Sequence, residues 1–166
     1  MVAWEDLRIF ALGAFRDVDP GRRTSLRVLE HLVSDLRDIG WGAFLSGDAR
    51  SVELAGRGLS PLAMTEALEP LSDLAVYVAT PTGREGGWAS ELTRMQTAHP
   101  EGAAKRIVML PHNYTLSAIL DPLQGGVLAE PRVLISWWSD RFDLLDQVSV
   151  YAEYVAHWGR LPSERF

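Results

Sequence analysis

The sequence contains no cysteine and a single lysine, Lys105, and the first of these shortages limits the possible chemistry. Without cysteine the protein has no disulfide, no thiolate metal site and no cysteine nucleophile. The four histidines (His31, His99, His112 and His157) are far apart, and none has the short spacing of a metal-binding motif such as H-E-x-x-H. We therefore expect no metal and no other cofactor.

Long apolar runs are also missing from the chain. No stretch approaches the roughly 18 uninterrupted apolar residues that a membrane span requires, and residues 1–6 do not combine a basic region with a following apolar one. These observations predict a cytoplasmic protein without a membrane partner. The net charge of -6 argues against a nucleic-acid partner, whereas a nucleotide-sized ligand needs only one or two local arginines. A length of 166 residues predicts a single domain over 1–166.

Five apolar runs alternate with helical patterns along the chain. Strands are expected at 7–12, 42–45, 74–79, 106–110 and 132–138, and helices at 24–39, 61–68 (with Ser60 as its cap), 88–98 and 140–157. This alternation is typical of an α/β protein with a parallel sheet covered on both faces. Five strands fit a flavodoxin-like three-layer fold with the strand order 2-1-3-4-5.

In that order the first and third strands are neighbours, so the loops that follow them should lie side by side. Open α/β sheets bind ligands at this edge. Residues 13–16 (G-A-F-R) follow the first strand, and residues 83–87 (G-R-E-G-G) follow the third. Their glycines permit a close approach of backbone to ligand, and a helix N-terminus favours an anion. Glycines also simply close tight turns, and both interpretations are open at this point.

Three short segments resemble the nucleoside 2-deoxyribosyltransferases. Leu12 to Phe15 (L-G-A-F) resembles the A-G-P-F turn of that family, and Ser72-Asp73 resembles its aspartate-led third strand. Residues 85–91 (E-G-G-W-A-S-E) are similar to its D-S-G-T-x-x-E segment. The matched positions are Glu85 at the aspartate, Gly87 at the glycine and Glu91 at the catalytic glutamate; Ala14 replaces a proline and Trp88 a threonine or serine.

The resemblance implies chemistry at an N-glycosidic bond. The related TIR domains, which cleave NAD, and the cytokinin-activating phosphoribohydrolases use a glutamate in a comparable place. By this resemblance Glu91 is the catalytic residue, and a neighbouring subunit of a homo-oligomer helps to close the pocket. The expected activity is hydrolysis or transfer at a nucleoside or nucleotide. The alternatives are a TIR-like NAD-cleaving enzyme, a non-catalytic nucleotide sensor and an interaction domain without a small ligand.

Carboxylates suit this chemistry, because positive charge develops on the sugar ring as the N-glycosidic bond breaks. The carboxylate of Glu91 can stabilise that charge or form a covalent glycosyl intermediate. A second carboxylate, Glu85 or Asp73, can orient Glu91 or a sugar hydroxyl, or hold a proton for the leaving base. For Asp73 we favour the alternative that it caps a turn at the start of its strand.

Other residues in these loops are candidates for binding the substrate. Phe15 and Trp88 can stack on a base or pack in the core, and Arg16 and Arg84 can bind a phosphate or remain solvated. Gly86 belongs to the same turn. His112 follows the fourth strand and can act as an acid or base, although a lone loop histidine more often has no chemistry. The long connection 113–131, with Gly125-Gly126, suggests a lid or an oligomer contact.

Overall fold

The sheet has the strand order expected from the sequence. In the computed structural model, which describes residues 3–117 and 133–166, five parallel strands are ordered β2-β1-β3-β4-β5. The strands are β1 (Arg8–Gly13), β2 (Gly42–Leu45), β3 (Leu74–Val78), β4 (Arg106–Pro111) and β5 (Leu134–Trp138). The flavodoxin-like α/β fold is therefore confirmed. Gly125-Gly126 and most of the connection 113–131 lie outside the described residues.

Five α-helices and three 3-10 turns accompany these strands in the part of the chain that the structure describes. The α-helices are α1 (Thr24–Asp38), α2 (Ala49–Ala55), α3 (Pro61–Leu68), α4 (Gly86–Ala98) and α5 (Arg141–Trp158). The 3-10 turns are η1 (Trp4–Asp6), η2 (Glu69–Leu71) and η3 (Pro100–Lys105). Described helices include none that is long and apolar enough to cross a membrane.

Side-chain caps fix where two of the helices between β2 and β3 begin. The Ser60 hydroxyl accepts a hydrogen bond of 3.2 Å from the Ala63 amide, which confirms the expected cap of α3. The sequence analysis missed α2, which is only seven residues long and carries no clear apolar stripe. Its N-cap is Asp48, whose carboxylate accepts from the Ser51 amide at 2.8 Å.

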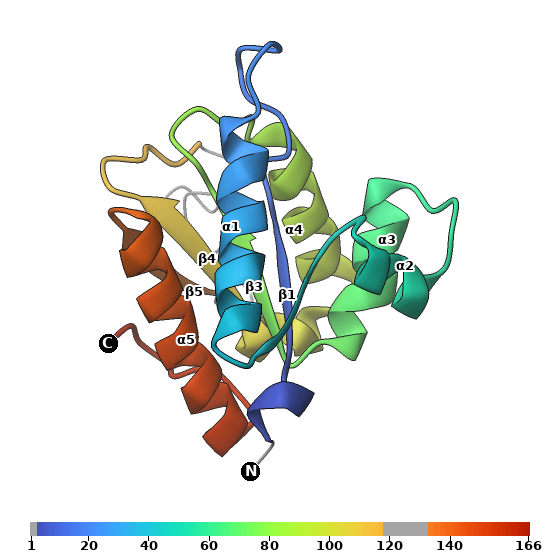
Figure 1. Cartoon of the computed structure of the whole chain (residues 1–166), viewed down its shortest axis with the longest axis vertical. Coiled ribbons are helices and arrows are strands. Elements are labelled where there is room, and N and C mark those ends of the chain that lie inside the picture. Colours follow the sequence, from blue (N-terminus) through green and yellow to red (C-terminus); the bar gives the residue numbers. More distant parts are fainter. Residues whose placement is uncertain (1–2, 118–132) are drawn as a thin grey trace.

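The helices form a layer on each face of the sheet (Figure 1). On one face α1 and α5 lie side by side and enclose a core with the inward side chains of the strands. On the other face α3 and α4 enclose a second core around Phe10, Tyr77 and Trp88. Trp137 packs toward the second core and Trp138 toward the first, so the two adjacent rings lie on opposite faces of β5 as alternation along a strand requires.

A buried ion pair links the second core to the start of β4. The Arg106 guanidinium is 1% exposed and donates to the Glu69 carboxylate, to Gln96 Oε1 at 2.6 Å and to the His99 carbonyl at 2.6 Å. The Tyr77 hydroxyl donates to the second oxygen of Glu69 at 2.5 Å. Each charged group therefore has hydrogen-bond partners that offset part of its desolvation. The network joins η2, α4, β3 and β4 beneath the helical layer.

Candidate active site at the carboxyl edge of the sheet

The loops that follow β1 and β3 are joined at the carboxyl edge, as the strand order leads one to expect. Asp17 and Gly83 form an antiparallel bridge between them. The Val18 amide donates to the Thr82 carbonyl at 2.8 Å, and the Arg84 amide donates to the Arg16 carbonyl at 2.8 Å. Two segments separated by more than 60 residues in the sequence thus form a short, defined backbone pairing over the switch point of the sheet.

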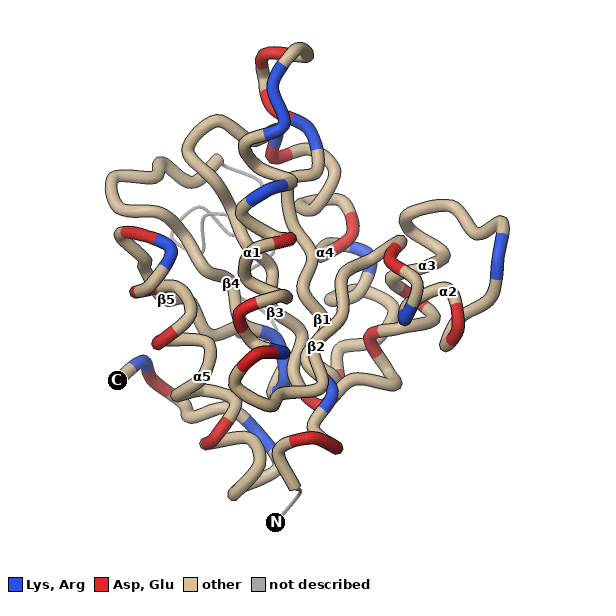
Figure 2. The backbone as a smooth tube through the Cα atoms, in the orientation of Figure 1, with Lys and Arg blue, Asp and Glu red and all other residues tan. Residues whose placement is uncertain are grey.

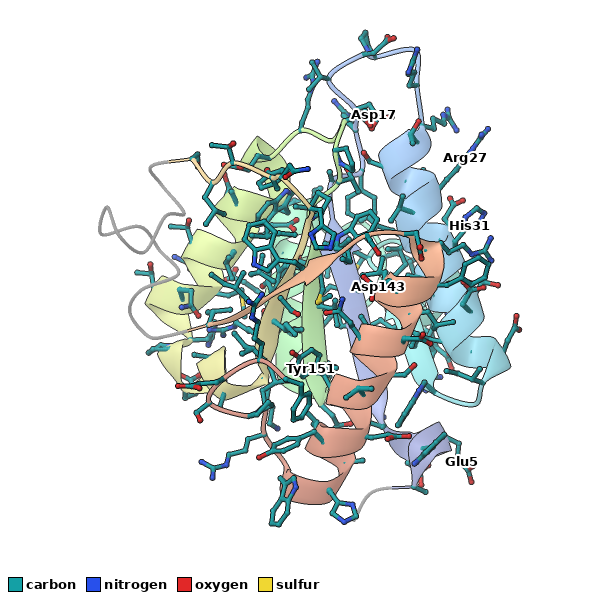
Figure 3. All side chains as sticks on the ribbon, turned by 90° about the vertical axis from the view of Figure 1, so that its left-hand side faces the viewer. Glu5, Asp17, Arg27, His31, Asp143 and Tyr151 are labelled. Carbon is teal, nitrogen blue, oxygen red and sulfur yellow. The ribbon has the colours of Figure 1, made fainter. Side chains whose placement is uncertain are left out.

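The carboxylate of Asp17 holds the two loops and the start of α1 together, at the point labelled in Figure 3. It accepts from the Thr24 amide at 2.7 Å, the Thr82 hydroxyl at 3.0 Å and both the amide and hydroxyl of Ser25. Asp17 is only 1% exposed. The hydrogen bond from the Ser25 hydroxyl is the main cause that lowers the pKa of Asp17.

Ser25 extends this cluster to the end of β3. Its hydroxyl lies 2.5 Å from the Thr80 hydroxyl. Because the single hydroxyl hydrogen of Ser25 is given to Asp17, Thr80 donates and Ser25 accepts. The chain Thr80 to Ser25 to Asp17 is therefore a directed set of hydrogen bonds that ties the end of β3 to the start of α1.

Two glycines allow the loops to pack this closely. A Cβ atom on Gly13 would overlap the Val78 carbonyl, and one on Gly83 would overlap Ala14 and the Thr80 hydroxyl. Gly13 and Gly83 therefore allow the close packing of the loops. Of the two roles that the sequence left open, a structural role and contact with a ligand, these two glycines have the structural one. Gly86 and Gly87 differ, because a Cβ on either would meet no atom of the described residues within 4 Å. The first turn of α4 is accordingly open to an approaching molecule.

Glu91 lies in the second turn of α4 and faces α3. It is 8% exposed, and burial raises its pKa to about 7. The nearby Thr65 hydroxyl of α3 lowers the pKa of Glu91 and so offsets a small part of the effect of burial. Because this hydroxyl forms no well-aligned hydrogen bond with the described residues, its contact with the carboxylate is weak. A carboxyl group in this setting exchanges its proton near neutral pH, which is the range in which an acid-base or nucleophilic group operates.

Glu85, the second carboxylate of the predicted motif, lies at the N-cap position of α4. Its side chain does not cap the helix. Instead it accepts a hydrogen bond of 2.5 Å from the hydroxyl of Tyr114, in the loop that follows β4. Burial and this bond raise the pKa of Tyr114 above its ordinary value, so the phenol stays protonated and donating. The loops after β3 and β4 thus meet beside the open first turn of α4.

The aromatic candidates do not form a base-stacking pair. Trp88 is 1% exposed and packs in the core beneath α3 and α4, whereas Phe15 packs against the core beneath α1 and α5. The sheet separates the two rings, so the structure does not meet the expectation that they enclose a base together. Ala14 is 3% exposed and packs with Trp88. The two departures from the family motif, Ala14 and Trp88, therefore fill the core.

Asp73 and His112 lie away from this group. Asp73 precedes β3 at the amino edge of the sheet and accepts the Arg8 amide at 2.8 Å. This contact is structural, but it joins β3 to the start of β1 and is not the turn cap favoured from the sequence. His112 is exposed at the carboxyl end of β4 and borders a groove of about 540 Å³ between β5 and α5. The structure therefore brings Gly13, Arg16, Arg84, Glu85 and Gly86 to one edge, with Glu91 further along α4. Asp73 lies at the opposite edge, and His112 lies at the carboxyl edge but toward α5.

Sequence reasoning missed Asp17, Ser25, Thr80, Thr82 and Tyr114. The partners Asp17 and Thr82 are 65 positions apart, and Glu85 and Tyr114 are 29 apart, so no local spacing marks them. The available signals were weak: an acidic residue shortly before a helix for Asp17, and an aromatic residue just beyond a strand end for Tyr114. Across residues 3–117 and 133–166, His, Asp and Glu form no group of three that could hold a metal ion.

Comparison with known proteins adds no family to this description. No family model matches the chain, and neither a curated protein nor a solved structure matches it. The fold and the site define the protein as a flavodoxin-like α/β domain with two interlocked loops and an open helix N-terminus at the switch point of its sheet. A buried carboxylate, Glu91, lies in the second turn of the same helix and faces α3.

Proposed function

We propose that the protein cleaves or transfers the N-glycosidic bond of a nucleoside or nucleotide, with Glu91 as its catalytic carboxylate. The observation that carries the proposal is the setting of Glu91: a carboxyl group 8% exposed, with its pKa raised to about 7, in the helix that follows the switch-point loop. Groups with such perturbed titration concentrate at active sites. The motif at 85–91 supports the same residue independently of its burial.

In the proposed reaction the bond between the sugar C1′ and the base nitrogen breaks, and its electron pair leaves with the base. The ionised Glu91 stabilises the positive charge on the sugar or bonds to C1′ as an ester. A proton joins the base, and water or a second base then attacks C1′. Water supplies hydroxide to C1′ in hydrolysis and returns one proton to solvent, so the atoms balance.

Glu85 and Tyr114 have a positioning role in this scheme. Their hydrogen bond of 2.5 Å fixes a carboxylate at the N-terminus of α4, where the second oxygen of Glu85 can accept a hydrogen bond from a sugar hydroxyl. Orientation of a sugar hydroxyl is one of the roles that the sequence left open for Glu85, and the geometry is compatible with it. The open surroundings of Gly86 and Gly87 leave space for the sugar beside it.

A second candidate function is a nucleotide sensor that binds at the same edge without catalysis. One observation favours it: Trp88 and Ala14 fill the core beneath the motif, and Glu91 is enclosed with them. A carboxylate so covered needs a movement of α3 or α4 to reach a sugar. The sensor uses the same open first turn of α4 and leaves Glu91 as a buried acid.

The experiment that separates these candidates is a chromatographic assay of free base. Wild type, Glu91→Gln and the control Glu153→Gln, an exposed residue of α5, are incubated with deoxynucleosides, nucleoside monophosphates and NAD. The proposal predicts release of base or nicotinamide by wild type and the control, and none by Glu91→Gln, which still binds. Binding of a panel member without release by any variant would overturn catalysis and favour the sensor.

A further inference from the structure

The pairing of the two loops places Arg16 directly opposite Arg84. With Asp17 bridged to Gly83, and with the Arg84 amide bonded to the Arg16 carbonyl, residues 16 and 84 are cross-strand neighbours. Both arginine side chains are exposed, whereas the side chain of Asp17, next to Arg16 in the pairing, is buried against Ser25.

Two like charges placed directly opposite one another destabilise a strand pairing. Both arginines are exposed, and among the described residues neither forms an ion pair. The nearby carboxylates are already engaged: Asp17 with Ser25 and Thr82, and Glu85 with Tyr114. Within residues 3–117 and 133–166, the arginine pair, Arg16 and Arg84, therefore lacks a counterion, although the net charge of the chain is -6.

The N-terminus of α4, next to the arginine pair, adds backbone amide donors with a partial positive charge. Arg84 is two residues before Gly86, the first residue of α4. No described side chain caps α4, and the space beside Gly86 and Gly87 is open. The N-cap residue is Glu85, whose carboxylate is turned to the Tyr114 hydroxyl instead of the helix amides. Free amides at the end of a 13-residue helix carry a partial positive charge and favour an anion. Figure 2 shows further basic segments in the loop between β1 and α1.

We propose that the arginine pair and the first turn of α4 bind the phosphate of the substrate, so that the protein acts on nucleotides in preference to free nucleosides. This inference rests on the proposed function for its choice of ligand. Guanidinium groups bind phosphate through paired hydrogen bonds, and two of them match the charge of a phosphate dianion. The phosphate then fixes the nucleotide at the edge, with its sugar toward Glu85.

The test is a calorimetric titration in the Glu91→Gln background, where no turnover is expected. A deoxynucleoside 5′-monophosphate and the matching deoxynucleoside are titrated into three proteins. These are the parent, Arg16→Gln/Arg84→Gln, and the control Arg57→Gln/Arg160→Gln, which removes two exposed arginines elsewhere. Melting temperatures confirm that each variant is folded.

The proposal predicts that the monophosphate binds at least roughly tenfold more weakly to Arg16→Gln/Arg84→Gln, and equally well to the parent and the control. The proposal also predicts that the affinity of the monophosphate for the parent protein falls as the salt concentration is raised. Equal binding to all three proteins, nucleoside affinity equal to that of the monophosphate, or no binding to the parent would each overturn it. Phosphate-dependent binding without base release by wild type would instead refute only the catalytic proposal.

Discussion

The Tyr114 hydroxyl donates a 2.5 Å hydrogen bond to the carboxylate of Glu85 and so joins the loop after β4 to the N-terminus of α4. Substitution Tyr114→Phe removes this bond and leaves a partly buried carboxylate without its donor. We expect the free energy of unfolding to fall by about 1 to 2 kcal/mol in urea titrations, because a hydrogen bond to a charged group is lost.

Tyr154→Phe is the matched control for this substitution. Tyr154 contacts the rings of Trp158 and Phe166, and its hydroxyl forms no hydrogen bond within the described residues. Its loss should change stability by less than about 0.5 kcal/mol. Equal effects of Tyr114→Phe and Tyr154→Phe would contradict the pairing of Tyr114 with Glu85.

The buried position of Glu91 predicts a pH-dependent difference between wild type and Glu91→Gln. The pKa of Glu91 is about 7 in the folded protein and 4.5 in its unperturbed state, so the folded protein binds this proton more tightly. Wild type should therefore lose stability relative to Glu91→Gln as the pH rises from about 4.5 to about 7. The total loss is on the order of 3 kcal/mol, and the difference stays constant at higher pH.

Urea titrations of both proteins between pH 4.5 and 8.5 measure this difference, with Glu153→Gln as the exposed control. A difference that does not change with pH would show that the Glu91 carboxylate is hydrated. This outcome would remove the physical basis for giving Glu91 a perturbed pKa, whatever the activity of the protein.

The contribution of Asp17 to stability should have the opposite pH dependence to that of Glu91. Hydrogen bonds from Ser25 and Thr82 lower the pKa of Asp17 below its unperturbed value of 3.8. Its contribution is therefore fully present above that value and is lost as the pH falls through the lower, folded-state pKa. We expect Asp17→Asn to be less stable than wild type at pH 7, with a difference that shrinks below about pH 4.

Asp19→Asn serves as the control for Asp17→Asn, because Asp19 lies in the same loop and its carboxylate makes exposed interactions, an ion pair with Arg22 and a hydrogen bond from the Gly21 amide. Its effect at pH 7 should be small. If Asp17→Asn and Asp19→Asn destabilised the protein equally, the account of Asp17 as the residue that joins the two loops would be wrong.

Arg106→Met should be strongly destabilising, because it leaves the buried carboxylate of Glu69 without its charged partner. Loss of one member of a buried ion pair costs about 3 to 5 kcal/mol. The matched control is Arg94→Met, which removes an exposed pair with Glu66 of N–O distance 2.8 Å and should cost less than about 1 kcal/mol. Similar midpoints of urea unfolding for the two variants would contradict the buried network.

The positions of the strands were predictable from the sequence because periodicity and strand composition are local signals. Their order followed from the flavodoxin-like fold that five strands alternating with helices fit. Leu74–Val78 is entirely buried, and α1 presents one continuous apolar face, so both were recognisable from residue spacing alone. The start of α4 was not located correctly: the apolar pattern placed it at Trp88, whereas the helix begins at Gly86, so that Glu85 is its N-cap. In addition, α2 is short and weakly patterned, and residue spacing offered no basis for expecting it.

The contacts of the candidate site were less predictable, because they depend on partners far apart in the sequence. Adjacency of the two loops followed from the strand order, whereas the bridge that sets Arg16 against Arg84 depends on the register of Asp17 with Gly83. Burial of Trp88 depends on how α3 and α4 pack over the sheet. Neither register nor packing is encoded in the spacing of a single segment.

The most direct test of Glu91 as the catalytic carboxylate is the rate of base release measured from pH 5 to 9 on a nucleoside monophosphate that wild type cleaves. Because Glu91 must be ionised and its pKa is about 7, the account predicts a rate that rises about tenfold per pH unit below 7 and levels off above it. Glu91→Gln should show no such rise. A rate that is independent of pH across this range, or that persists in Glu91→Gln, would contradict the account.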